Sequence, residues 1–142
     1  MKYTTISIIA LLLFIKCQPK LLGTVSEIHF DHDSTNIDEI NLNNLIGIAN
    51  LCNKDTDIHL KVFGFSDTIG TEEHNMELSK TRSLKVYNYI MEHSKLQINN
   101  TTLKWFGESK EINELEKKGQ QNCVYISVQI PKGINLSMDA SR

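Results

Sequence analysis

Residues 64–83, GFSDTIGTEEHNMELSKTRS, join the end of one apolar segment to the start of a long helix. Before them, DIHLKVF (57–63) alternates apolar and polar side chains, which is typical of a strand with one buried face. A turn framed by two glycines follows. Thr71 then starts the helix, because threonine accepts a capping hydrogen bond and the two glutamates after it favour the positive end of the helix dipole. The stretch therefore predicts a strand, a turn that holds Asp67, and a helix that runs to about His93.

Further strands and helices are predicted on both sides of this stretch. They are a strand at 25–30, a helix at 38–52, a strand at 103–106, a short polar helix from Ser109 to Gly119 and a last strand at 123–130. The 38–52 helix has an apolar stripe made of Leu42, Leu45, Ile46, Ala49 and Cys52. The core side of the long central helix carries Leu78, Val86 and Ile90.

This order of elements, βαβαβ(α)β, predicts an α+β fold. Strands that alternate with helices favour parallel pairs and right-handed crossovers within a mixed sheet. Because the strands alternate in polarity and lack continuous apolar runs, we expect one covered sheet face and therefore a two-layer sandwich with the helices on one side. A chain of 142 residues has room for one such domain, which we place at 25–131, with a flexible tail at 132–142.

The N-terminus is predicted to be a signal and not part of the domain. Its apolar run, ISIIALLLFI (6–15), is shorter than the ~20 residues that cross a membrane. The run ends near Cys17, as in bacterial lipoprotein signals, where such a cysteine is acylated and becomes the new N-terminus; Lys16 stands where a small residue is expected. We predict a lipoprotein-type signal peptide at 1–17, an acylated Cys17 and a linker at 18–24. The alternative is an ordinary exported protein whose signal is cleaved elsewhere or retained.

The net charge gives no reason to expect nucleic acid as a partner. The formal net charge is −2, which supplies no electrostatic attraction for nucleic acid, and we predict none as a ligand. Export permits disulfides, so Cys52 and Cys123 either pair with each other or remain two buried thiols.

Several catalytic and metal-binding patterns are incomplete. DHDST (31–35) resembles the nucleophile motif of haloacid-dehalogenase phosphatases, but the chain after the signal leaves little room for their core and shows no second acidic pair. The same loop lacks the glycine and glutamate of a calcium loop. His29 and His32 have no further ligand cluster, and Ser66 lacks the second glycine of a nucleophile elbow. We predict a protein that is not an enzyme, with no metal and no cofactor.

A binding site is the better prediction. Asn75, Ser79 and Arg82 fall on one face of the central helix, and long helical side chains lean toward the helix N-terminus, where Asp67 lies. A carboxylate and a guanidinium that converge near a helix N-terminus suit a zwitterion, with Asp67 for an ammonium group and Arg82 for a carboxylate. The spacing is equally consistent with a structural ion pair between Asp67 and Arg82 that binds no ligand.

The residues of this stretch also carry a family resemblance. GFSDTIGTEEHNMELSKTRS resembles the signature of the OmpA-like peptidoglycan-binding domain family, G-x-(S/T)-D-x-x-G, then an Asn, then L-S-x-x-R-(A/S). IHFDHDSTNI (28–37), VYNYI (86–90) and WFGES (105–109) resemble further segments of that family. The resemblance covers about residues 25–131 and implies the fold of OmpA C-terminal domains.

The resemblance implies roles for particular residues. Asp67 and Arg82 correspond to the pair that binds the amino and carboxyl groups of diaminopimelate in the peptidoglycan stem peptide. Asn75 corresponds to a supporting asparagine, while His32 and Asp33 lie in the loop that approaches the ligand. The family's last strand usually shows N-R-R-V-E-I, whereas this chain has QNCVYISV (121–128) without an arginine. That departure is expected to reduce the affinity or to alter the preferred stem peptide.

The signal and the resemblance together predict an outer-membrane lipoprotein that faces the periplasm. Its acyl chains would anchor it in membrane lipid, its domain would bind peptidoglycan, and the two would tether the membrane to the cell wall. This layout resembles that of peptidoglycan-associated lipoproteins, and no protein partner follows from the residues. The alternative is a domain that keeps the fold, has lost the ligand and acts as a structural or interaction lipoprotein.

Overall fold

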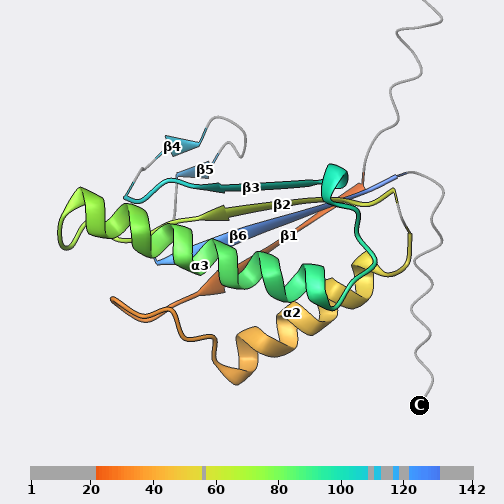
Figure 1. Cartoon of the computed structure of the whole chain (residues 1–142), viewed down its shortest axis with the longest axis horizontal. Helices are drawn as coiled ribbons and strands as arrows, with labels where there is room; N and C mark the ends of the chain where they lie inside the picture. Colours follow the sequence, from red (N-terminus) through yellow and green to blue (C-terminus); the bar gives the residue numbers. More distant parts are fainter. Residues whose placement is uncertain (1–21, 56, 109–110, 113–116, 119–121, 132–142) are drawn as a thin grey trace, which may run out of the picture.

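The computed structural model describes residues 22–55, 57–108, 111–112, 117–118 and 122–131 (Figure 1). The elements in chain order are β1 (Leu22–His29), α2 (Glu39–Cys52), β2 (His59–Gly64), α3 (Glu72–Glu92), a 3-10 turn η1 (Ile98–Asn100), β3 (Thr101–Trp105), β4 (Glu111–Ile112), β5 (Lys117–Lys118) and β6 (Cys123–Ile130). Within these described ranges, no helix is both long and apolar enough to cross a membrane.

The main sheet has four strands in the order β1-β6-β2-β3. The last strand, β6, lies between β1 and β2 and is antiparallel to both, while β2 and β3 are parallel. Both long helices lie on the same side of this sheet, and α3 crosses in front of β2 and β6 (Figure 1). The predicted α+β two-layer sandwich with a mixed sheet is therefore confirmed.

The core lies between the sheet and the two helices. Its buried side chains come from alternate positions of the strands and from one face of each helix, and include Ile28, Leu45, Leu60, Val62, Val86, Ile90, Ile126 and Val128. At ~25 cal/mol per Å² of apolar surface removed from water, this burial is the main term that opposes the chain entropy lost on folding. The core fixes α3 against β2, and that packing positions the site described below.

The buried face of α2 differs from the predicted stripe. Leu45, Ala49 and Cys52 are buried as expected, but Leu42 and Ile46 are 37% and 42% exposed. Asn41 and Ile48 take the inner positions instead. The cause is a hydrogen bond between α2 and the end of β1. The Nδ2 of Asn41 donates to the carbonyl of His29 at 3.0 Å, which places a polar side chain on the buried face of the helix.

Residues 22–24 and the segment at 109–119 also differ from the sequence expectation. Residues 22–24, placed in the linker, extend β1, since the ladder with β6 continues as far as the pair Leu22 and Ile130. The predicted helix at 109–119 is wrong, because β4 and β5 pair as antiparallel strands through Glu111 with Lys118 and Ile112 with Lys117. The segment has few apolar residues, so no amphipathic face holds it as a helix against the core. Ser109, Gly119, residues 1–21 with Cys17, and the tail at 132–142 lie outside the described residues.

The sheet face opposite the helices is not bare. Phe63, Phe65, Cys123 and Tyr125 form a second buried cluster, with Phe106 packed against it. These side chains point away from the main core because neighbouring residues of a strand face opposite sides. The Phe65 and Phe106 rings stack at 5.4 Å between centroids, which holds the chain after β3 against the end of β2.

Candidate ligand-binding site

The candidate site lies at the end of the sheet where β2 stops and β6 begins. A pocket of about 120 Å³ opens there between the turn after β1, the turn after β2 and the first turns of α3. Its lining residues are His32, Asp33, Asp67, Ile69, Gly70, His74, Asn75 and Leu78. The chain elements that meet here are far apart in sequence, so the site exists only in the folded domain.

Close packing of α3 on β2 brings these elements together. A Cβ added to Gly64 would overlap the carbonyl oxygen of Ser79, so only glycine lets the helix approach the strand this closely. Ser79 also accepts a hydrogen bond from the N–H of Gly107 at 2.9 Å through its Oγ. The predicted Thr71 cap is confirmed, since its side chain accepts from the N–H of His74. The N-terminus of α3 is therefore held beside the turn that carries Asp67.

Asp67 is only 6% exposed and its carboxylate is held by hydrogen bonds. Its Oδ2 accepts from Nδ2 of Asn122 at 2.7 Å and is 2.8 Å from Nδ1 of His32, and its Oδ1 accepts from the N–H of Ile69 at 2.9 Å. Burial raises the pKa of Asp67, but the hydrogen bonds from Asn122, His32 and Ile69 outweigh burial and lower it to about 2. Asp67 therefore carries a fixed negative charge at the edge of the pocket at neutral pH.

Arg82 is completely buried and, unlike Asp67 and Asn75, is not among the residues that line the pocket. Its Nε donates to the carbonyl of Ser34 at 2.8 Å and its Nη2 to the carbonyl of Asp31 at 2.9 Å. Its Nη1 donates to the carbonyl of Phe65 at 3.2 Å and to Oδ1 of Asn122 at 2.9 Å. Burial lowers the pKa of Arg82, and the negative charge of Asp67 opposes that effect.

These contacts answer part of the question that the sequence left open. Asp67 and Arg82 both lie in the described part of the chain and are close enough to influence each other electrostatically. They nevertheless form no direct ion pair. Asn122 stands between them and bonds to both. The predicted convergence of Asp67 and Arg82 is therefore present, but it is indirect and needs a residue that the sequence reasoning did not include.

Asn75 has the feature most expected of a ligand contact. It is 0% exposed, and its Oδ1 has no hydrogen-bond partner, while its Nδ2 makes only a long 3.4 Å bond to Oε2 of Glu108. A buried acceptor without a donor costs about 1–3 kcal/mol, so such groups are rare unless a ligand or water satisfies them. Asn75 lines the pocket together with Asp67. The pocket therefore combines a charged acceptor with a neutral one.

The turn after β1 closes one side of the pocket. His32 reaches Asp67, and Oδ1 of Asp33 lies 2.6 Å from Nε2 of His74 on α3. Asp33 has a left-handed φ of 51°, which aspartate tolerates better than most residues. Both histidines are about half exposed, so these bonds lie at the solvent side of the site and are the ones a ligand can most easily replace.

His74 and Asn122 were missed by the sequence reasoning. Asn122 has a left-handed φ of 56° directly before β6, and an asparagine ahead of a strand is a recognisable signal for such a turn. His74 lies in the first turn of α3, next to Asn75, and no sequence pattern distinguished it. Among the described residues, no group of three or more His, Cys, Asp or Glu side chains is placed to hold a metal ion.

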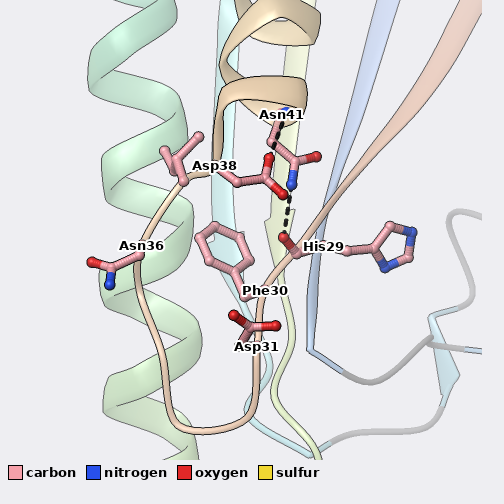
Figure 2. A pocket seen from close by; sticks show the side chains of 7 residues that line it. His29, Phe30, Asp31, Asn36, Asp38 and Asn41 are labelled. Atoms are coloured by element: carbon pink, nitrogen blue, oxygen red, sulfur yellow. Dashed lines mark hydrogen bonds between the residues drawn. The ribbon is translucent and has the colours of Figure 1, made fainter.

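A second pocket, of about 210 Å³, lies between the end of β1 and the start of α2 (Figure 2). Two of its polar side chains stabilise the fold, since Asp38 accepts from the N–H of Asn41 as the helix cap and Asn41 donates to the carbonyl of His29. It contains none of the predicted site residues. The smaller pocket is therefore the better candidate, because it holds the buried charge and the unpartnered acceptor.

Comparisons with known proteins agree with this fold. The OmpA family model matches residues 29–123. A search for similar sequences among curated proteins gave no match. Similar solved structures include the peptidoglycan-associated lipoprotein from Burkholderia pseudomallei, with 19% identity, a TM-score of 0.61, and coverage of 72% of this chain and 89% of that one.

Two further structures share the architecture. The OmpA-like domain of FopA1 from Francisella tularensis has 20% identity and a TM-score of 0.63, with coverage of 82% of this chain and 78% of that one. The C-terminal domain of Helicobacter pylori MotB has 22% identity and a TM-score of 0.58, with coverage of 71% and 81%. At this identity the structures show a common fold only. Because the family model spans most of the chain, including both Asp67 and Arg82, this protein belongs to the OmpA family.

Proposed function

We propose that this domain binds peptidoglycan through the diaminopimelate of its stem peptide. The observation that carries the proposal is the pairing, in one pocket, of the buried carboxylate of Asp67 with the unpartnered Oδ1 of Asn75. An ammonium group has three donors and no acceptor, so it suits a pocket whose buried groups are acceptors. One structure with a similar fold is the peptidoglycan-associated lipoprotein from Burkholderia pseudomallei, whose name agrees with this choice of polymer.

The ammonium would take the place of one existing donor on Asp67. Of the three donors, His32 is a half-exposed side chain that can turn away, whereas Ile69 donates through its backbone N–H and the Asn122 amide is also bonded to Arg82. Departure of the His32 N–H leaves Oδ2 open for the ligand, and Asn75 accepts a second ammonium hydrogen. The methylene chain of the ligand fits against Leu78 and Ile69, which line the same pocket. His32 and Asp33 then remain as contacts at the rim.

We assign Arg82 to the ligand carboxylate. A guanidinium has five N–H donors, and Arg82 uses four of them on Ser34, Asp31, Phe65 and Asn122. A bidentate grip therefore requires Arg82 to release at least one of these four acceptors, two of which are carbonyls of the turn at 31–34. The assignment predicts that ligand binding and loss of one of these hydrogen bonds occur together.

We further propose that the chain is an outer-membrane lipoprotein facing the periplasm, anchored through an acylated Cys17. A membrane-anchored domain that faces a repeating polymer has a high effective concentration and many equivalent partners, so each contact can be weak. Mass spectrometry of the mature N-terminus tests the anchor. A peptide that runs unmodified through Lys16 and Cys17 rules it out.

A second candidate function is a structural or interaction lipoprotein that has lost the ligand. Two observations favour it: the guanidinium of Arg82 is almost saturated by the chain itself, and β6 carries no arginine. If this second function is correct, Arg82 binds only groups of the protein itself and contacts no ligand.

Cosedimentation with isolated peptidoglycan sacculi distinguishes the two functions. We expect the purified chain, kept in detergent, to pellet with sacculi that contain diaminopimelate. Asp67→Asn should stay folded and remain in the supernatant, because it keeps the side-chain shape and loses the charge-assisted bond, worth ~1.5–3 kcal/mol. Asp57→Asn, an exposed aspartate near the opposite end of β2, is the matched control and should pellet normally. An unaltered chain that does not pellet would overturn the proposal and favour the second function.

A further inference from the structure

The side chain of Asn122 connects the two opposite charges of the site. Its Oδ1 accepts from Nη1 of Arg82 at 2.9 Å, and its Nδ2 donates to Oδ2 of Asp67 at 2.7 Å. Its backbone carbonyl accepts from the N–H of Phe30 at 2.8 Å, so the residue is also tied to the end of β1. Asn122 does not line the pocket, and it stands in the segment where the family's last strand usually shows N-R-R-V-E-I.

We propose that Asn122 is a positioning residue, which holds the carboxylate of Asp67 in the orientation that receives the ligand ammonium and prevents it from pairing with Arg82. This inference rests on the proposed ligand site and assigns a further residue to it. Asn122 itself need not touch the ligand.

The chemistry of the amide explains why this residue suits the task. Arg82 offers only donors and Asp67 only acceptors, so a neutral bridge must accept on one side and donate on the other. A primary amide does both with one planar group, whereas a carboxylate has no donor and an ammonium has no acceptor. A direct ion pair would turn the carboxylate toward Arg82 and satisfy it there, which would compete with any incoming ammonium. The bridge keeps both charges in place without joining them.

The bridge also prepares Asp67 for the loss of His32. When a ligand replaces the His32 N–H, the bonds from Asn122 and Ile69 remain, one on each carboxylate oxygen. The carboxylate therefore does not need to reorient during binding, and a preorganised group loses less entropy when it binds.

The backbone at this position restricts the choice of residue. Asn122 has a φ of 56°, a left-handed conformation that asparagine and glycine adopt more readily than other residues. The next residue, Cys123, is fully buried, and its carbonyl accepts from the N–H of Phe65 at 2.8 Å. The start of β6 is thus anchored beside the turn of Asp67, and the amide is carried on a fixed part of the fold.

The test uses Asn122→Gly, which removes the amide and keeps the left-handed turn without strain. Calorimetric titration of the full chain with diaminopimelate is expected to show at least a ~10-fold loss of affinity relative to the unaltered chain, or ~1.4 kcal/mol. Asn50→Gly, on the exposed side of α2, lowers helix propensity away from the site and should leave the affinity unchanged. The comparison separates loss of the bridge from loss of stability.

A second readout reports on Asp67 directly. The hydrogen bond from Asn122 helps to lower the pKa of Asp67, so Asn122→Gly should raise that pKa, as followed by NMR titration of the side-chain carboxyl. Asn122→Asp replaces the glycine variant in the test if that variant does not fold. It keeps the side-chain shape and the tolerance for a left-handed φ but donates nothing to Asp67, so it should also weaken binding. Asn50→Gly should leave the pKa in place.

The outcomes separate the two proposals. Absence of binding by the unaltered chain overturns the proposed function, and the positioning role falls with it. Normal binding by the unaltered chain, with equal affinity in Asn122→Gly and an unmoved pKa of Asp67, overturns the positioning role alone. Reduced affinity with a raised pKa supports both.

Discussion

At the residue scale, the guanidinium of Arg82 joins three separate segments before any ligand is present. It bonds to the turn after β1, to the end of β2 through Phe65, and to Asn122 ahead of β6, and it lies over the ring of Phe30 at 5.1 Å. A planar group with donors along three edges can do this, and a lysine ammonium on a flexible stem cannot. Arg82 therefore stabilises the site as well as being our candidate for the ligand carboxylate.

This double role leads to a prediction for Arg82→Lys. At least one of the carbonyls of Asp31, Ser34 and Phe65 would lose its donor. The Phe65 carbonyl is the buried one, and leaving it unsatisfied costs about 1–3 kcal/mol, so the free energy of unfolding should fall by up to that amount. Urea denaturation measures it. Affinity for diaminopimelate, measured by calorimetry on the folded fraction, should also fall by at least ~10-fold. Lower stability with unchanged affinity would limit Arg82 to a structural role.

A second residue-scale prediction concerns pH. The pKa of Asp67 is lowered to about 2 in the folded domain. An unfolded aspartate titrates near 3.9, so Asp67 contributes stability that is present above about pH 4 and is lost as the pH falls toward about 2. Asp67→Asn should therefore flatten the decline of unfolding free energy between about pH 4 and 2. Urea denaturation at a series of acidic pH values checks this, and an unchanged slope would contradict the hydrogen-bonded state of the carboxylate.

At the scale of elements, the closeness of α3 to β2 decides whether the pocket exists. Gly64 faces the carbonyl of Ser79 and the side chain of Ser83, where an added Cβ would lie 2.8 Å from the Ser83 Cβ. Neither neighbour can move unless the helix moves, because one is helix backbone and the other is fully buried. The site therefore depends on a glycine in a strand, a position where glycine is otherwise unfavourable.

We predict that Gly64→Ala destabilises the domain and weakens ligand binding together. Overpacking of this kind costs typically 1–3 kcal/mol, seen as a lower melting temperature. Gly47→Ala is the matched control, since a Cβ there meets nothing within 4 Å, and it should stabilise α2 by about 0.4–1 kcal/mol. A Gly64→Ala variant with unchanged melting temperature would show that the helix can shift without cost.

At the scale of the whole molecule, the sheet separates two buried clusters. Cys52 belongs to the main core and Cys123 to the aromatic cluster on the other face, so the two thiols lie on opposite sides of the sheet. Neither is in a disulfide, although both fall within the described part of the chain. The sequence left a disulfide and two buried thiols open, and the structure has the buried thiols.

This arrangement predicts how the thiols react. Burial raises the pKa of Cys52 to about 11 and is the main cause that raises that of Cys123 to about 12, so neither forms a reactive thiolate at neutral pH. Both should resist alkylation in the folded state and react together when urea unfolds the domain, as followed by mass spectrometry. Rapid labelling of Cys123 alone in native buffer would show that the aromatic cluster opens independently of the core.

The sequence by itself determined the order of the main strands and helices, the Thr71 cap and the positions of Asp67, Asn75 and Arg82 on a turn and one helix face. These follow from local rules of periodicity, capping and turn chemistry, which act within a few residues. It failed at 109–119, where no apolar face supports a helix, and on α2, where the hydrogen bond from Asn41 to His29 altered the buried face.

Only the tertiary structure decided how the two charges of the site are related. Asn122 is 40 residues from Arg82 and 55 from Asp67, and it reaches them because β6 runs antiparallel beside β2. The same is true of His32 and Asp67, which are 35 residues apart. The sequence pattern of a single helix or strand cannot predict these contacts. They arise when the sheet assembles and brings the ends of distant segments to one edge.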